Sequence, residues 1–460
     1  MVKLNLFDIQ GFVARGYTFP RASYLLAEIL NYKAGREFVG RVTERVTSAE
    51  RWDNKPSSTL NIGFTWKGLY KLGLRDATML SFPDEFYQGM RARNRVLGDV
   101  GKNDPANWEP VWTEDIHVWL AIYAQDASEL ARRCEEIGRL MQETGGARLL
   151  YTQQAGAICI DGKATSKEHF GYTDGFGNPD YEGVERKTVP GQGKLTPDGR
   201  WAPLATGEFI LGYPDEAREL PVCPVPYILG INGTYMAYRK LHQNVASFRK
   251  YLDDKGNRYP GGKEKLAAKF VGRWMDGTPL ESSPDHNDLG LAGDPSRSTD
   301  FTYGHDADGG RCPIGSHIRR ANPRDAFGFN GDLVNRRRIM RRGLPYGEYT
   351  PPDQPARDED EHGIVFMALG ASLFRQFEFV QQQWIEYGND ARLGNDKDLL
   401  VGCHNDADDR FVVQGSTDPG NTPFICGGLP NFVEMRGGEY FFLPSLTALR
   451  LIADGTVDPR

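Results

Sequence analysis

One run of the sequence sets a single histidine between a turn-forming segment and a row of arginines: Arg311-Cys312-Pro313-Ile314-Gly315-Ser316-His317-Ile318-Arg319-Arg320-Ala321-Asn322-Pro323-Arg324. The proline and the glycine predict a turn directly before His317. A histidine that binds a metal needs one ring nitrogen facing the metal while the other donates to a fixed acceptor. His317 is a candidate for this role, and Arg319, Arg320 and Arg324 are candidates to meet the anionic groups of a ligand bound beside it. The alternative is an ordinary hydrogen-bonded histidine in a basic loop.

Composition indicates a folded protein with room for a deep pocket. The chain has 460 residues, which exceeds the size at which one hydrophobic core keeps growing, so we expect two domains or one domain with insertions. Hydrophobic residues at 39% and charged residues at 25% are globular values. The six cysteines form no C-x-x-C pair, so we expect reduced cysteines and neither a disulfide framework nor a structural zinc site.

Charge and hydropathy exclude two classes of partner. The net charge is -7, and the arginine-rich run at 336–342 is too small for a nucleic-acid-binding face. No stretch approaches the roughly 20 apolar residues that span a membrane. The first residues lack the apolar segment of a signal peptide, so we expect a cytoplasmic protein.

The pattern of strands and helices repeats in two halves. A strand at 116–123 precedes a helix capped by Asp126, and a strand at 363–369 precedes a helix from about residue 372. Strand-then-helix patterns also occur at 60–74 and 235–252. This order predicts an α+β fold with antiparallel sheets covered by helices. The Gly- and Pro-rich run at 190–200 separates the halves, giving expected domains at 1–205 and 206–460.

Two further motifs give His317 a context. Gly171-Tyr172-Thr173-Asp174-Gly175-Phe176-Gly177-Asn178-Pro179 lets the backbone turn tightly or approach a flat cofactor, although alone it also fits a surface turn. A calcium loop is a poorer fit, because Phe176 stands where a ligand is needed. Arg338-Ile339-Met340-Arg341-Arg342-Gly343-Leu344-Pro345-Tyr346-Gly347 alone suggests a basic strand edge.

Together the three motifs, G-x-x-D-G, C-P-x-G-x-H-I-R-R-x-N-P-R and R-R-G-x-P-Y-G, resemble the dye-decolourising peroxidase family and occur in that family's order. The resemblance covers most of the chain, including residues 8–11 and 207–213, and is greatest for the longer members of the family. It implies two ferredoxin-like domains, each an antiparallel sheet with helices. The N-terminal one carries G-x-x-D-G, and the C-terminal one holds most of the pocket for one haem b per chain.

The resemblance also implies roles for single residues. It makes His317 the proximal iron ligand, Asp174 the distal acid/base and Arg341 the distal arginine. Asp398 best matches the carboxylate partner of the histidine, with Asp396 and Glu378 as alternatives.

Other positions match cofactor contacts and electron-transfer sites. The expected haem contacts, besides His317 and Asp398, are Gly175, Phe176, Arg324 and Phe366. Ile364 and Phe366 match an apolar distal wall, and ordinary strand packing is the alternative. Trp384 and Tyr346 match positions near the surface that carry electrons in some relatives, and packing in the core is the alternative for Trp384.

The implied activity is the reduction of hydrogen peroxide to water through a ferryl intermediate, coupled to oxidation of dyes, phenolics or other one-electron donors, including metal ions. Because reduction of the ferryl state consumes protons, we expect an acidic optimum. A chlorite-splitting enzyme on related domains is a rival that Asp174 and Arg341 argue against. A non-catalytic haem-binding or iron-handling protein of the same fold is the other alternative. We expect no nucleic-acid or membrane partner, and a homo-oligomer is possible.

Overall fold

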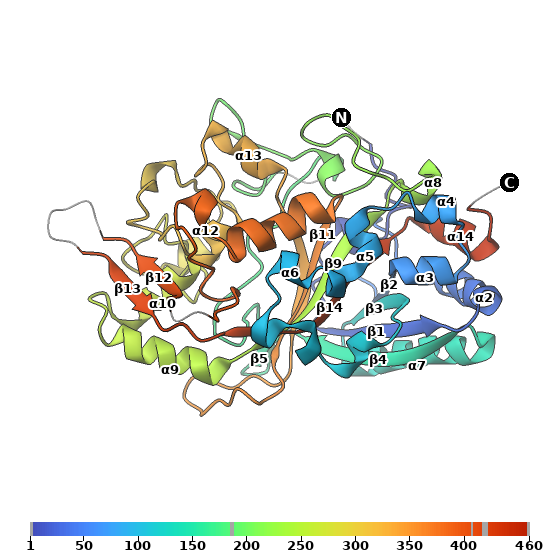
Figure 1. Cartoon of the computed structure of the whole chain (residues 1–460), viewed down its shortest axis with the longest axis horizontal. Helices are drawn as coiled ribbons and strands as arrows, with labels where there is room; N and C mark the ends of the chain where they lie inside the picture. The colour runs from blue at the N-terminus through green and yellow to red at the C-terminus, as the bar shows by residue number, and fades with distance from the viewer. Residues whose placement is uncertain (1–2, 185–187, 406–407, 416–421, 458–460) are drawn as a thin grey trace.

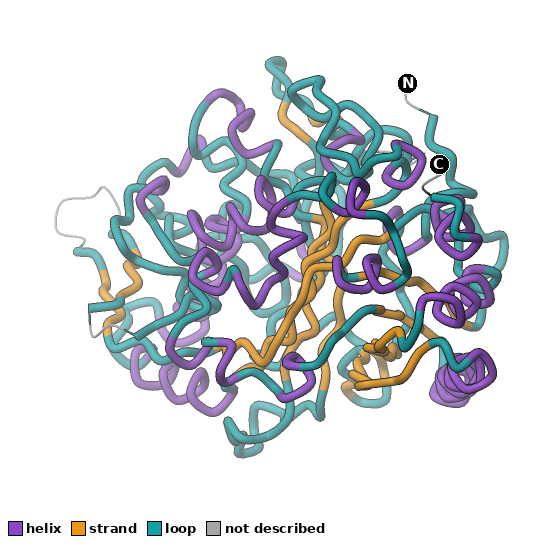
Figure 2. Tube along the Cα trace, turned by 45° about the vertical axis from the view of Figure 1, so that its right-hand side comes forward, coloured by secondary structure: helices purple, strands orange, loops and turns teal. Residues whose placement is uncertain are grey.

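Eight strands form one antiparallel sheet through the middle of the molecule (Figures 1 and 2). The computed structural model describes residues 3–184, 188–405, 408–415 and 422–457. The order across the sheet is β10-β11-β9-β14-β2-β3-β1-β4. The strands are β1 (Arg21–Ile29), β2 (Ser58–Phe64), β3 (Val118–Ala124), β4 (Ala147–Gly156), β9 (Thr234–Gln243), β10 (Met340–Tyr346), β11 (Gly363–Gly370) and β14 (Val433–Leu443).

The N-terminal half contributes β2, β3, β1 and β4 with their helices. Its long helices are α2 (Tyr32–Thr43) and α7 (Ala127–Thr144), with α3 (Trp66–Lys71) and α5 (Asp84–Ala92) between them in sequence. Every residue of β3 is buried, which explains its continuous apolar sequence. The predicted cap of α7 is confirmed, because Asp126 accepts a hydrogen bond from Glu129 N at 2.9 Å.

The C-terminal half repeats the same order of strands and helices. Its helices include α9 (Val245–Gly256), α10 (Gly262–Val271) and α12 (His317–Ala321). The helix expected from about residue 372 is confirmed: η7 (Leu373–Glu378) and η8 (Val380–Ile385) are joined through the helical Phe379 into one helix, which has the wider turns of a π-helix. The short strands β12 (Arg410–Val413) and β13 (Phe424–Gly427) form a separate pair at one end of the molecule (Figure 1).

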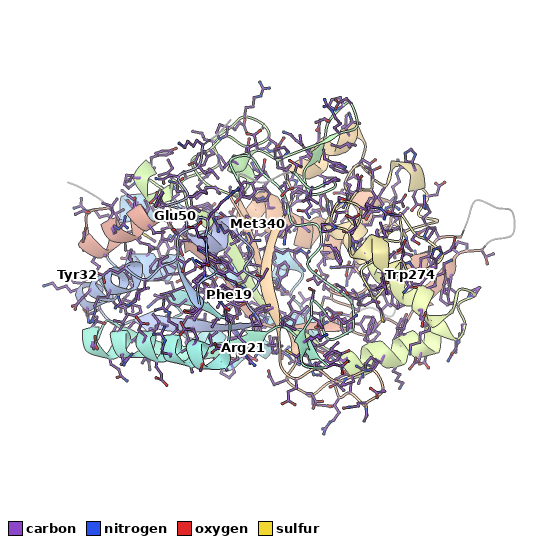
Figure 3. All side chains as sticks on the ribbon, turned by 180° about the vertical axis from the view of Figure 1, so that it is seen from behind. Phe19, Arg21, Tyr32, Glu50, Trp274 and Met340 are labelled. Atoms are coloured by element: carbon purple, nitrogen blue, oxygen red, sulfur yellow. The ribbon has the colours of Figure 1, made fainter. Side chains whose placement is uncertain are left out.

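The two halves meet in the sheet at one pair of residues. Phe442 of β14 pairs with Phe64 of β2, so two four-stranded sheets merge into one. In Figure 3, Met340 at the start of β10 lies near the centre, between Tyr32 of the N-terminal half and Trp274 of the C-terminal half. The expected two-domain α+β fold is confirmed. The boundary at residue 205 stays a prediction, and it separates β1–β4 from β9–β14.

Three further features concern the last helix, the cysteines and the character of the helices. The helix α14 (Leu446–Asp454) returns to the N-terminal half and packs against α2. All six cysteines are free, as expected. Among the described residues, no helix has both the length and the apolar character that crossing a membrane requires.

Candidate active site

A cavity of about 310 Å³ lies against one face of the C-terminal half of the sheet. Alternate residues of β9, β11 and β14 face it, because side chains of the same parity share one face of a strand. These include Leu241, Ile364, Phe366, Val433 and Met435. The helix α12 contributes His317 and Ile318 to the wall, and the loop before β7 (Lys194–Leu195) contributes Asp174 and Phe176.

His317 is the first residue of α12, directly after the predicted turn, in which Ser316 N donates to Pro313 O at 3.0 Å. Its Nδ1 lies 3.0 Å from Asp398 Oδ2. The second oxygen of Asp398 accepts from Leu400 N at 3.0 Å and from Val401 N at 2.9 Å, so the carboxylate is fixed. Nε2 has no hydrogen bond to any described residue, and about 30% of the side chain stays accessible from inside the cavity.

The charges of His317 and Asp398 depend on each other. Burial raises the pKa of Asp398, but the adjoining His317 outweighs this and the pKa lies below its ordinary value. Burial lowers the pKa of His317, but Asp398 outweighs that effect and the pKa is raised. Since an ionised carboxylate only accepts hydrogen bonds, Nδ1 is the donor and the free Nε2 faces the cavity.

The two alternative carboxylates lie in other interactions. Asp396 pairs with Arg410 at 3.2 Å. Glu378 is buried against the guanidinium of Arg93 and accepts the hydroxyl hydrogen of Tyr440 at 2.8 Å. Of the three carboxylates, Asp398 is the one that contacts His317.

Asp174 and Arg341 form an ion pair in the cavity wall. Arg341 Nη1 donates to Asp174 Oδ1 at 3.0 Å, and Nη2 donates to Phe176 O at 2.7 Å. The backbone N–H of Arg341 donates to Asn178 Oδ1 at 2.9 Å, so β10 holds the glycine-rich loop by its side chain and its backbone. Burial raises the pKa of Asp174, but the nearby Arg341 outweighs it, and the pKa falls below its usual value.

Gly175 has a structural role in this loop. Its φ of +100° is a conformation that favours glycine, and its N–H donates to Asp174 Oδ1 at 2.6 Å. Gly175 is not among the described residues that line the cavity, whereas Phe176 and Gly177 are.

Three buried arginines line the cavity without a carboxylate partner among the described residues: Arg273, Arg324 and Arg338. Each donates to backbone carbonyls, for example Arg324 Nη1 to Thr299 O at 2.9 Å. Burial lowers the pKa of Arg273 to about 10 and of Arg338 to about 9. Buried positive charge without a counter-ion is unfavourable, so this wall fits a group that brings its own carboxylates, as haem does.

The sequence-based expectation for the arginines is partly wrong. Arg319 and Arg320 are turned away from the cavity, because Arg319 pairs with Asp306 and Arg320 donates to Trp384 O. Arg324 does line the cavity, as expected. The sequence did not identify Arg273, because its neighbours form no recognisable motif, or Arg338, because nothing in its arginine-rich motif distinguishes this arginine from the others.

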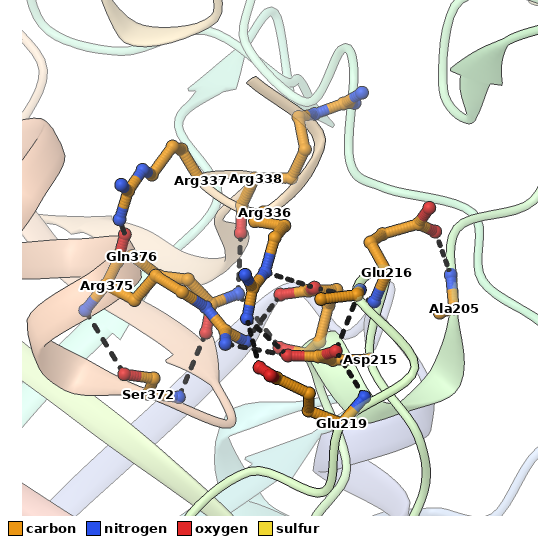
Figure 4. A network of polar contacts seen from close by, with 12 residues as sticks. Ala205, Asp215, Glu216, Glu219, Arg336, Arg337, Arg338, Ser372, Arg375 and Gln376 are labelled. Atoms are coloured by element: carbon orange, nitrogen blue, oxygen red, sulfur yellow. Dashed lines mark hydrogen bonds and ion pairs between the residues drawn. The ribbon is translucent and has the colours of Figure 1, made fainter. Parts of the chain in front are cut away.

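A network of ion pairs fixes the segment that leads into β10 (Figure 4). Arg375 pairs with Glu208 and Asp215, both at 2.8 Å, and Arg336 pairs with Asp215 at 2.7 Å. Gln376 Nε2 donates to the carbonyl of Arg338 at 2.9 Å. The backbone of Arg338 is thereby held while its side chain extends toward the cavity and away from the acidic residues (Figure 4).

A histidine outside the expected site joins the two segments that carry Asp174 and Arg341. His169 Nε2 donates to the carbonyl of Tyr346 at the end of β10, at 2.8 Å. The ring stacks on that of His362, with 5.1 Å between ring centroids. Burial, followed by the effect of His362, lowers the pKa of His169 to about 4, so the imidazole is neutral near neutral pH.

The expected aromatic residues divide between the cavity and the core. Ile364 and Phe366 line the cavity. Trp384 and Tyr346 are only 5% and 3% exposed, so neither ring is open to solvent. Trp384 is covered by Phe327 and Phe379, and the Lys240 ammonium lies 4.9 Å from the ring centroid of Tyr346. Electron transfer through either residue stays a prediction.

Comparison with known proteins identifies the family. The family model "DyP dimeric alpha+beta barrel domain" matches residues 9–150, and "Dyp-type peroxidase, C-terminal" matches residues 229–397. The chain is 30% identical to the Multifunctional dye peroxidase DyP2 of Amycolatopsis sp. over 419 residues, 85% of this chain and 81% of that protein. It is 27% identical to the Dye-decolorizing peroxidase msp1 of Mycetinis scorodonius, over 98% of this chain and 88% of that protein.

Solved structures agree with this match. The structure of a dye-decolorizing peroxidase in complex with 2,6-dimethoxyphenol superposes with a TM-score of 0.82 and 27% identity, covering 98% of this chain and 100% of that one. The chain belongs to the dye-decolourising peroxidase family. It is therefore an oxidoreductase, a peroxidase of the dye-decolourising type, and a non-catalytic role is not favoured.

The network of Figure 4 predicts a large effect on stability. Replacing Arg375 by Leu leaves the buried carboxylates of Glu208 and Asp215 without one of their partners, so we expect the free energy of unfolding to fall by about 3–5 kcal/mol. Urea unfolding of the variant measures this. The control is Arg357→Leu, whose ion pair with Glu359 is exposed and contributes less than about 1 kcal/mol. Equal losses of unfolding free energy in both variants would contradict the stabilising role of the Arg375 ion pairs.

The burial of neutral His169 predicts a loss of stability in acid. The folded protein binds a proton at His169 less readily than the unfolded chain, so this contribution is complete above about pH 6.5 and is lost as the pH falls toward about 4. The slope is about 1.4 kcal/mol per pH unit in that window. Unfolding free energies measured across it for His169→Gln should show a shallower slope, while the exposed His305→Gln keeps the original slope. Parallel profiles in all three proteins would refute this role.

Proposed function

We propose that the chain binds one haem b and uses it to reduce hydrogen peroxide to water while oxidising dyes, phenolics or other one-electron donors. The observation that carries this proposal is the free Nε2 of His317, which faces a cavity walled by arginines that lack carboxylate partners. The phenol bound to a structural relative supports phenolic donors for this chain as well. When bound, haem supplies the redox-active iron at which peroxide is reduced and donors are oxidised.

We assign the binding of haem to residues of both cavity walls. His317 Nε2 is the iron ligand, and Asp398 fixes the ring and increases its electron donation. Arg273, Arg324 and Arg338 pair with the propionates. Phe366 and Ile364, on the sheet side of the cavity, would supply apolar contacts to the bound haem.

Asp174 is the acid/base of the reaction. Because Arg341 keeps it ionised, Asp174 accepts the proton of the inner peroxide oxygen and returns it to the outer oxygen, which leaves as water. Arg341 stabilises the negative charge that develops as the O–O bond breaks. The ion pair between the two residues also holds the carboxylate in position.

The distal pair gives a prediction for peroxide reduction. Asp174→Asn should keep the haem spectrum but slow the reaction with peroxide about 10²–10⁴-fold, because no base remains. Arg341→Leu should slow it about 10²–10³-fold. Stopped-flow absorbance of the Soret band measures both rates, with Asp360→Asn in an exposed loop as the control. Unchanged rates in both distal variants would exclude this assignment.

The coupled charges of His317 and Asp398 predict how haem uptake depends on pH. The iron must displace a proton that Asp398 helps His317 to retain, so haem binding by the apoprotein should weaken as the pH falls through the raised pKa of His317. In Asp398→Asn the midpoint should move to lower pH. Spectrophotometric haem titrations at a series of pH values measure this shift, and a midpoint that is unmoved or higher in the variant argues against the pairing. His317→Ala should lose the normal Soret band at every pH.

A further inference from the structure

A buried tyrosine and carboxylate lie behind the cavity and have no part in the proposed reaction with peroxide. Tyr440 of β14 and Glu378 of η7 are each 1% exposed. The hydroxyl of Tyr440 donates to Glu378 Oε1 at 2.8 Å, and Arg93 forms an ion pair with the same carboxylate. Burial, followed by the charge of Glu378, raises the pKa of Tyr440 far above its ordinary value, so the phenol holds its proton at rest.

This pair is connected to the cavity by one aromatic ring. Phe377, the residue before Glu378, lines the cavity. Its ring centroid lies 6.2 Å from that of Tyr440, with the rings at 76° to each other. An electron that passes from Tyr440 to a group in the cavity therefore crosses a single intervening side chain.

We propose that Tyr440 is a redox-active residue that supplies an electron to the oxidised cofactor while Glu378 takes its proton. This inference rests on the proposed function, because reaction with peroxide supplies the oxidant. The cofactor is reduced by one electron, the phenolic O–H bond breaks, and the proton moves to Glu378 Oε1, which leaves a neutral tyrosyl radical. A one-electron aromatic donor then reduces the radical, and the proton returns from Glu378 to the phenolic oxygen.

The proton acceptor distinguishes Tyr440 from tyrosines that lie nearer to the cofactor. Tyr303 and Tyr172 both line the cavity. The hydroxyl of Tyr303 has no hydrogen-bond partner within the described part of the chain, and that of Tyr172 donates to the carbonyl of Ala267, which is not a base. Oxidation of either one leaves a buried cationic radical, which is unfavourable in an apolar environment. Tyr440 avoids this charge because its proton has a carboxylate to go to.

Glu378 and Arg93 connect Tyr440 with the surface of the protein. Arg93 Nη1 donates to the side chain of Gln88 at 3.1 Å, in an exposed contact near the end of α5. The side chain of Arg93 is 14% exposed, so Glu378 and Arg93 separate Tyr440 from solvent on this side. A donor too large for the cavity can deliver an electron here. The order along this path is donor, Tyr440, Phe377 and cofactor.

Electron paramagnetic resonance on the haem-loaded protein tests the proposal. Hydrogen peroxide is added without a donor, the sample is frozen within the reaction time, and tyrosine with a deuterated ring identifies tyrosyl signals by their narrower lines. We expect a tyrosyl radical that Tyr440→Phe removes and Tyr303→Phe retains. Glu378→Gln keeps the ring of Tyr440 but removes the carboxylate that accepts its proton, so formation of the radical should slow about 10²-fold.

The outcomes separate this inference from the proposed function. A signal that persists in Tyr440→Phe, or that Tyr303→Phe abolishes, overturns the role of Tyr440. A Soret band that responds to peroxide without any tyrosyl signal overturns the inference and leaves the proposed function intact. A Soret band that does not respond to peroxide overturns both. Thermal unfolding of each variant verifies that it is folded, and Glu378→Gln tests the proton transfer independently of Tyr440→Phe.

Discussion

The hydrogen bond between His317 Nδ1 and Asp398 Oδ2, 3.0 Å long, determines which ring nitrogen is available to the cavity. Two backbone N–H groups of its own loop fix Asp398, and the hydrogen bond to Asp398 therefore holds the imidazole ring of His317 in one orientation. A histidine ring without such a partner is free to rotate and to exchange tautomers. The binding of a metal at Nε2 depends on this bond.

The charged side chains of the cavity wall determine which kind of ligand the cavity favours. Arg341 is balanced by Asp174, whereas the buried Arg273, Arg324 and Arg338 donate to backbone carbonyls and form no ion pair among the described residues. Burying these guanidinium groups away from water is unfavourable for folding. A ligand with carboxylates offsets this unfavourable free energy. The ion pairs of Arg375 and Arg336 fix the segment before β10, and His169 fixes its far end, so the strand that carries Arg341 is held at both ends.

Sequence alone predicted the order of strands and helices and the three residues around which the site is built. His317, Asp174 and Arg341 stand in motifs whose glycines and prolines favour turns and whose arginines carry charge, effects that can be recognised from the sequence. The structure places His317, Asp174 and Arg341 in the wall of one cavity. Asp398 could be proposed only from a short match, because its pairing with His317 spans 81 residues.

Other features depend on tertiary packing that local patterns do not encode. The apolar stripe containing Trp384 indicates a buried face, but not that Phe327 and Phe379 also cover the indole ring. Arg319 and Arg324 belong to the same run, yet only their surroundings turn one toward Asp306 and the other toward the cavity. The merging of two sheets at Phe442 and Phe64, and the contact of Tyr440 with Glu378, likewise join segments that are distant in sequence.

Resonance Raman spectroscopy of the reduced, haem-loaded protein, with and without ¹⁵N-labelled histidine, shows directly whether His317 binds the iron. If His317 binds the iron and Asp398 orients it, a low-frequency iron–imidazole band shifts on labelling, moves to lower frequency in Asp398→Asn and is absent in His317→Ala. A band that is insensitive to the label, or that persists unchanged in His317→Ala, would show that His317 is not the iron ligand.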